Sequence, residues 1–158
     1  MEGCALKLGV LIAASAGLAL VAGSVANAEF SPTEAIAARI SAYRETGAAF
    51  KTIRDQLKSD TPLKIMLRTS AKRIQTTAHD QYTWFTPGSG PEAGVKTKAL
   101  PKIWTDPEGF KVVQARFQKE ADLMVQVVDT GDTAAIKAQA QALGEACGAC
   151  HKVYRAAD

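Results

Sequence analysis

The sequence predicts an all-α protein, an antiparallel bundle of four helices in a single domain. Four segments of the 158-residue chain carry apolar residues at alternating spacings of three and four, which is the period of an amphipathic helix. The composition agrees with this prediction. Aromatic residues make up 6% of the chain and alanine is abundant, which favours closely packed helices over a β-sandwich.

The first 28 residues have the features of a cleaved signal peptide. Lys7 precedes an apolar run from Leu8 to Val25, and Ala26-Asn27-Ala28 then matches the small-x-small pattern that signal peptidase cleaves. A membrane anchor is the alternative interpretation, but the run is rich in alanine, glycine and serine. We therefore expect an exported, periplasmic protein consisting of residues 29–158.

The first predicted helix runs from Ser31 to about Ser59. Ser31 and Glu34 match a capping box, and Pro32 occupies the first helical position. Apolar or small residues then recur along one stripe, which we expect to face the core: Ile36, Ile40, Tyr43, Gly47, Phe50 and Leu57.

The second predicted helix begins at Thr61-Pro62 and ends before Trp84. Its stripe is less apolar and contains Leu63, Met66 or Leu67, Ser70, Ile74 and Thr77. A loop is expected from Thr86 to Pro101, because residues 87–91 (PGSGP) are dense in helix breakers. A loop of this length in a compact domain is usually functional, so we expect it to cover a site.

The third predicted helix begins at Asp106, with Pro107 in its first turn, and ends at Gly131, while Asp132 caps the fourth. Short connections join the first helix to the second and the third to the fourth, which predicts antiparallel packing. The stripes of the third and fourth helices are Phe110, Val113, Phe117, Met124, Val127 and Val128, then Ile136, Ala140, Leu143, Cys147 and Tyr154.

Residues 147–151 (CGACH) form the C-x-x-C-H signature of c-type haem attachment. Each thiol of such a motif adds to one vinyl group of the porphyrin, and the two intervening residues match the distance between the vinyls. On a helix, Cys147 and His151 lie four residues apart and share one face. The motif therefore predicts one haem c, attached through Cys147 and Cys150, with His151 as the proximal iron ligand.

Other uses of a cysteine pair are less consistent with the sequence. A thioredoxin-like redox pair is expected beside a βαβ pattern, which is missing here. A zinc site needs further ligands, yet the chain has one other histidine, His79, and no second cysteine pair. We expect His79 on the surface. The net charge of +3 is mild, so nucleic acid is not an expected partner.

The C-terminal sequence CGACHKVYR, residues 147–155, resembles the C-x-x-C-H-x-x-Y-R ending of the cytochrome c prime family, the class II cytochromes c. Residues 39–51 (RISAYRETGAAFK) resemble the family's first-helix pattern R-Q-x-x-[M/L/Y]-x-x-I-G-x-x-M-K. Residues 84–89 (WFTPGS) resemble its W-x-x-F-x-P-G-S stretch, and residues 97–104 (TKALPKIW) resemble T-K-A-x-P-E-I-W. The resemblance spans the whole mature chain.

The resemblance implies that the bundle encloses the haem at one end, and that two copies often pair through their first two helices. Carried over by position, Arg39 and Thr97 approach the haem propionates, since a guanidinium pairs well with a carboxylate. Arg155 then flanks His151. A solvated helix charge is the alternative for Arg39, because exposure is the usual state of arginine.

Tyr43 aligns where low-spin members place a methionine ligand and where gas-binding members place a side chain over the iron. Its reference pKa near ~10 makes coordination as a phenolate costly, which favours steric blocking of the haem face. We therefore expect a five-coordinate haem that binds small gases such as nitric oxide, transfers electrons to redox partner proteins, or both. A six-coordinate low-spin electron carrier is the alternative. We do not expect an enzyme, because no distal His–Arg pair aligns over the iron.

Overall fold

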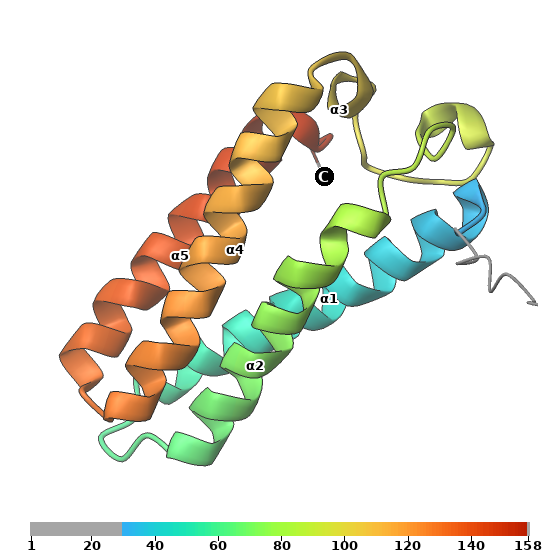
Figure 1. The fold of residues 1–158 in the computed structure, drawn as a ribbon. Coiled ribbons are helices and arrows are strands. Elements are labelled where there is room, and N and C mark those ends of the chain that lie inside the picture. The colour runs from blue at the N-terminus through green and yellow to red at the C-terminus, as the bar shows by residue number, and fades with distance from the viewer. Residues whose placement is uncertain (1–29, 158) are drawn as a thin grey trace, which may run out of the picture.

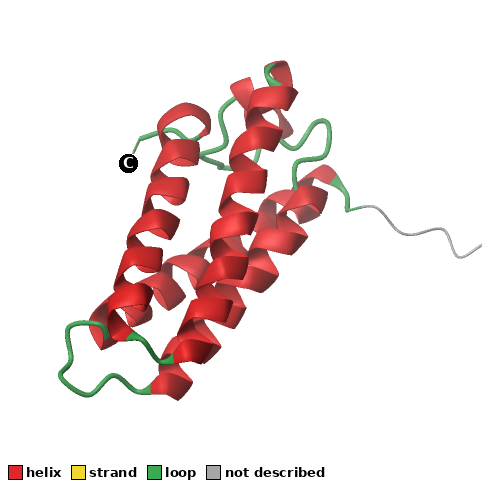
Figure 2. Ribbon diagram, turned by 60° about the vertical axis from the view of Figure 1, so that its left-hand side comes forward, coloured by secondary structure: helices red, strands yellow, loops and turns green. Residues whose placement is uncertain are grey.

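The computed structural model describes residues 30–157, which form a bundle of four long helices (Figure 1). The helices are α1 (Pro32–Gln56), α2 (Lys64–Asp80), α4 (Pro107–Thr130) and α5 (Thr133–Tyr154). α1 pairs with α2, α4 pairs with α5, and α2 packs against α4 to join the two hairpins (Figure 2). The predicted all-α four-helix bundle is confirmed. The predicted signal peptide lies outside the described residues.

Three short elements lie in the connection between α2 and α4. They are the 3-10 turns η1 (Gln81–Thr83) and η2 (Pro91–Ala93) and the one-turn helix α3 (Lys102–Thr105), which the sequence analysis did not anticipate. The connection returns to the end of α5 through a bridge between Ala99 and Arg155. Its backbone bonds run from Leu100 N to Tyr154 O at 3.0 Å and from Ala156 N to Lys98 O at 2.8 Å. The connection is thereby fixed beside the last turn of α5.

Local capping chemistry sets most of the helix ends as predicted. The Ser31 hydroxyl accepts from Glu34 N at 3.4 Å, and Ser31 N donates to the Glu34 carboxylate at 2.9 Å. Asp132 caps α5 through bonds from two backbone amides, and Gly131 ends α4 in the left-handed region at φ 76°. Asp106 accepts from Gly109 N at 3.1 Å at the start of α4.

The predicted start of α2 at Thr61-Pro62 is wrong. The helix begins at Lys64, and its N-cap residue Leu63 has no side-chain oxygen to accept a backbone bond. Instead, Leu63 N donates to the Gln56 side-chain oxygen at 2.8 Å, across the turn from the end of α1. A contact over seven residues therefore sets this helix start in place of a local cap.

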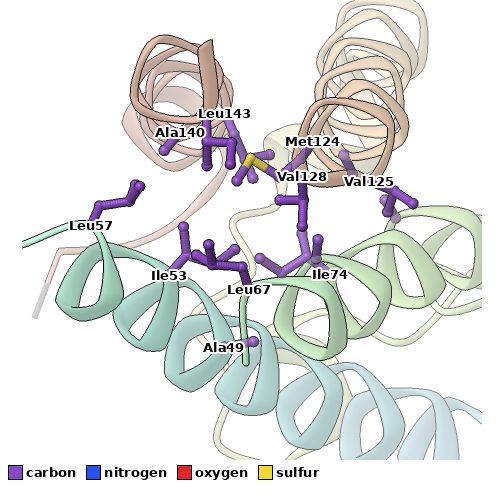
Figure 3. Packing of buried hydrophobic residues seen from close by; sticks show 14 of the residues in the cluster. Ala49, Ile53, Leu57, Leu67, Ile74, Met124, Val125, Val128, Ala140 and Leu143 are labelled. Carbon is purple, nitrogen blue, oxygen red and sulfur yellow. The ribbon is translucent and has the colours of Figure 1, made fainter. Parts of the chain in front are cut away.

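The main core lies between the two hairpins, where Ile53, Ile74, Met124 and Leu143 are fully enclosed (Figure 3). The stripe predicted for α1 is partly wrong. Gly47 is exposed and Ile40 is only half-buried, whereas Arg39, Thr46 and Ile53 are buried. Hydrophobicity alone could not identify this band, because two of its central positions are polar. No helix within residues 30–157 is long and apolar enough to cross a membrane.

Candidate haem site

The two cysteines of the motif lie in the last turns of α5 and are half-buried free thiols. Cys147 packs against the main core, and Cys150 packs against a second apolar cluster of Ile103, Phe110 and Tyr154. Burial raises the pKa of both thiols, that of Cys150 to about 11. Both side chains therefore lie, protonated at neutral pH, along an apolar surface, as attachment to a hydrophobic macrocycle requires.

His151 follows one turn after Cys147 and remains exposed over more than a third of its surface. Partial burial lowers the pKa of its imidazole, and the positive charge of Arg155 lowers it further. The prediction that Arg155 flanks His151 agrees with this electrostatic influence. The neutral imidazole is the form that binds a metal.

Tyr43 points into the bundle from α1, where its ring meets the edge of Trp84 at a centroid distance of 5.9 Å. Its hydroxyl donates to Gln81 Oε1 at 3.2 Å. The Gln81 amide nitrogen donates to Ala78 O at 2.9 Å and to Gln114 O at 3.3 Å, which fixes the amide orientation and leaves Oε1 to accept. Burial raises the pKa of Tyr43 well above its ordinary value, so the side chain is a neutral phenol.

Arg39 is buried, with 3% of its surface exposed, and clamps the connection between α2 and α4. Its two terminal nitrogens donate to Trp84 O at 3.2 Å, to Ser89 Oγ at 3.0 Å and O at 2.6 Å, and to Thr97 Oγ1 at 2.9 Å. Its guanidinium also lies 5.1 Å from the ring centroid of Phe85. The structure therefore brings Arg39 and Thr97 together, and it excludes a solvated helix charge for Arg39.

A chain of aromatic contacts holds the end of α5. Phe110 packs edge-on against Phe85 at 4.7 Å and against Tyr154 at 5.1 Å. The Tyr154 hydroxyl donates to the Asp106 carboxylate at 2.8 Å, which ties the last turn of α5 to the first turn of α4. This contact fixes the part of α5 that carries His151.

The profile of the family described as cytochrome c' matches residues 34–155. This chain belongs to the cytochrome c' family. It is 36% identical to cytochrome c' of Rhodospirillum rubrum over 96% of this chain and 99% of the relative. The crystal structure of cytochrome c' from Thermochromatium tepidum covers 82% of this chain and all of its own length, at 26% identity and a TM-score of 0.77.

A third relative is the ferrous form of a variant cytochrome c' from Alcaligenes xylosoxidans, whose structure has nitric oxide bound. It is 26% identical to this chain, covers 82% of it and 100% of its own length, and gives a TM-score of 0.72. Family membership makes this protein a c-type cytochrome with one covalently attached haem c.

The residues present in this cytochrome fit that group. Two half-buried thiols and a neutral imidazole lie on the last turns of one helix, as covalent attachment and iron ligation require. Arg39 adds a buried cation whose four hydrogen bonds to Trp84, Ser89 and Thr97 all go to uncharged oxygens. The Glu92 carboxylate acts on this charge through space. Haem propionates would supply further carboxylates to stabilise it.

The other histidine bonds a different set of side chains. His79 is exposed between α2 and α4, with Nε2 2.8 Å from Asp122 Oδ1 and Nδ1 3.2 Å from the Gln118 amide nitrogen. Within residues 30–157, no three His, Cys, Asp or Glu side chains gather in a group that could hold a metal ion. His79 thus lies on the surface as predicted.

The sequence analysis missed Gln81 and Ser89 as parts of the site. Ser89 is fully buried and carries two of the four Arg39 bonds, and Gln81 fixes Tyr43. Ser89 did lie within the recognised Trp84–Ser89 stretch, so a signal was present. No pattern in the sequence distinguished Gln81 from a surface glutamine.

Proposed function

We propose that Cys147 and Cys150 form the two thioethers, that His151 is the proximal ligand, and that no side chain ligates the iron on the opposite face. The protein is then a periplasmic five-coordinate cytochrome that binds small gases such as nitric oxide, transfers electrons, or does both. Haem iron supplies the site for a diatomic ligand and for single-electron exchange. Arg39 and Thr97 bind the propionates in this proposal.

The state of Tyr43 is the observation that carries five-coordination. Its phenol is neutral, and its proton is committed to Gln81. A phenolate ligand is therefore disfavoured, and the ring acts as a steric cover. Of the methionines in the described chain, Met66 is exposed on α2 and Met124 is fully enclosed in the core. Neither is poised as a strong sixth ligand of the kind that raises the potential of an electron carrier.

Three further parts of the proposal have separate support. The nitric oxide complex of the Alcaligenes xylosoxidans relative supports a gas as the ligand. The signal-peptide pattern of residues 1–28 supports export to the periplasm. A homodimer through α1 and α2 is also part of the proposal, and exposed Leu63, Ile65 and Met66 on and before α2 favour it.

The visible spectrum of the purified holoprotein tests the proposal. We expect a high-spin ferric spectrum and carbon monoxide binding after reduction. A sharp low-spin spectrum with no carbon monoxide binding would instead establish the six-coordinate electron carrier. A pyridine haemochrome assay on Cys147→Ala and Cys150→Ala checks the attachment, because each variant should retain one thioether.

Tyr43 variants test the steric cover. Tyr43→Ala should speed carbon monoxide binding, because it removes the ring. Tyr43→Phe is the matched control, since it keeps the ring and loses only the hydroxyl bonded to Gln81. Equal binding rates in all three proteins would show that Tyr43 does not cover the iron.

A further inference from the structure

Thr46 carries a buried hydroxyl that has no hydrogen-bond partner within the part of the chain that the structure describes. The residue lies on α1 with 8% of its surface exposed. Leaving a buried hydroxyl unpaired costs ~1–3 kcal/mol, so such a group in a native protein needs an explanation.

Two other threonines inside the helices of this bundle bond carbonyls of their own helix. Thr52 donates to Ala48 O and Thr76 donates to Lys72 O, each at 3.1 Å. This bond to the carbonyl four residues earlier is the usual solution for threonine inside a helix. Thr46 also has a carbonyl four residues earlier in its helix, yet its hydroxyl makes no such bond. The unpaired hydroxyl is therefore a feature of this position and not of helical threonines in general.

The place of Thr46 in the sequence of α1 indicates which side of the helix it occupies. Positions three, four and seven apart share one side of a helix, so Arg39, Tyr43 and Thr46 lie on the same stripe. Tyr43 cannot supply a proton along this stripe, because its hydroxyl donates to Gln81 at 3.2 Å. Farther along, the buried positions Ala49 and Ile53 are apolar. Thr46 is therefore the next polar residue on the side of α1 that bears Tyr43, and its hydroxyl is available to donate a hydrogen bond.

We propose that the Thr46 hydroxyl donates a hydrogen bond to a diatomic gas bound at the haem face that Tyr43 covers. This inference rests on the five-coordinate haem of the proposed function. A hydroxyl in a dry interior interacts more strongly than it does in water. Such a donor favours ligands that carry partial negative charge on their outer atom. Thr46 is then a specificity-determining residue, one turn beyond the steric cover.

The infrared stretch of carbon monoxide on the reduced holoprotein tests the inference directly, because a hydrogen bond to the bound gas lowers that frequency. Thr46→Val removes the hydroxyl and keeps the shape, so the stretch should move to higher wavenumber. Carbon monoxide should also dissociate about fivefold faster, which corresponds to ~1 kcal/mol. Thr46→Ser keeps the donor and should restore both values. Thr52→Val is the matched control and should leave both unchanged, since that hydroxyl bonds its own helix.

The possible outcomes distinguish the role of Thr46 from the five-coordinate haem on which it rests. If carbon monoxide binds but Thr46→Val leaves its stretch and dissociation rate unchanged, the Thr46 inference is overturned and five-coordination stands. Such a result would mean that a water molecule or the helix carbonyl satisfies the hydroxyl. If the wild-type spectrum is low-spin and carbon monoxide does not bind, both claims fail. Thr46→Val should fold, because it removes an unpaired buried polar atom, and a far-UV circular dichroism spectrum checks this.

Discussion

Replacing Arg39 with alanine should destabilise this protein strongly, because one side chain holds the connection between α2 and α4 in place. Its guanidinium makes four hydrogen bonds, to Trp84, twice to Ser89, and to Thr97. These partners lie 45 to 58 residues away along the chain. Arg39→Ala therefore removes the contacts that close this long connection over α1.

The loss of stability in Arg39→Ala depends on which other hydrogen bonds each partner of Arg39 keeps. Ser89 Oγ still donates to Thr86 O at 2.8 Å, and Thr97 Oγ1 still accepts from Ala99 N at 3.2 Å. The carbonyls of Trp84 and Ser89 lose the Arg39 donor, at ~1–3 kcal/mol for each buried acceptor left unpaired. Burial lowers the pKa of the guanidinium, so part of the loss is offset when the charge is removed. We expect a net loss of about 2–4 kcal/mol.

Urea unfolding of the holoprotein measures this loss. Because a bound cofactor can break two-state behaviour, circular dichroism and Soret absorbance must give the same midpoint before free energies are compared. Arg44→Ala is the control, since Arg44 is exposed on the same helix and should change stability by no more than ~0.5 kcal/mol. Arg39→Lys should fall between the two, because an ammonium cannot reproduce the guanidinium fork. A loss of stability below ~1 kcal/mol for Arg39→Ala, or one equal to that of Arg44→Ala, would show that Arg39 does not hold the connection between α2 and α4 in place.

Two further predictions concern other parts of the bundle. Burial raises the pKa of the Asp122 carboxyl, but hydrogen bonds from His79 and Gln75 outweigh burial and hold the pKa below its ordinary value. The stability that this carboxylate contributes is present above about pH 4 and is lost as the pH falls through the lowered pKa. In Asp122→Asn, the melting temperature should therefore fall less steeply as the pH is lowered into the acid range. An unchanged fall would contradict a stabilising role of the Asp122 carboxylate. Leu143→Ala should cost about 2–5 kcal/mol in urea unfolding, because Leu143 is fully enclosed in the core, and a loss under ~1 kcal/mol would mean that the core collapses around the gap.

The sequence predicts those features of the fold whose causes are local. The caps at Ser31, Asp106 and Asp132 each bond amides two or three residues ahead, so the capping pattern is visible in a short window. The start of α2 differs from the prediction because the amide of its N-cap residue, Leu63, bonds the side chain of Gln56, seven residues earlier. Local sequence patterns do not indicate that Gln56 has this role.

Buried polar residues account for most of what the sequence could not show. Hydrophobic periodicity placed Gly47 and Ile40 on the core-facing stripe of α1, where the structure has Arg39 and Thr46 buried instead. A polar residue in a core is determined by its partners, and those of Arg39 are distant in sequence. The family resemblance did identify Arg39 and Thr97 as members of one site, but their mutual hydrogen bond became visible only in three dimensions.

The same distinction separates the two faces of the haem site. The attachment motif lies within one turn and a half of a single helix, so the residue spacing of Cys147 and His151 already contains its chemistry. The opposite face is assembled across helices. The Gln81 amide is oriented by carbonyls of α2 and α4, which leaves its oxygen to accept from Tyr43. A phenol that must donate to Gln81 has no proton for a bound gas, so hydrogen bonding to that gas falls to the next donor along α1, Thr46.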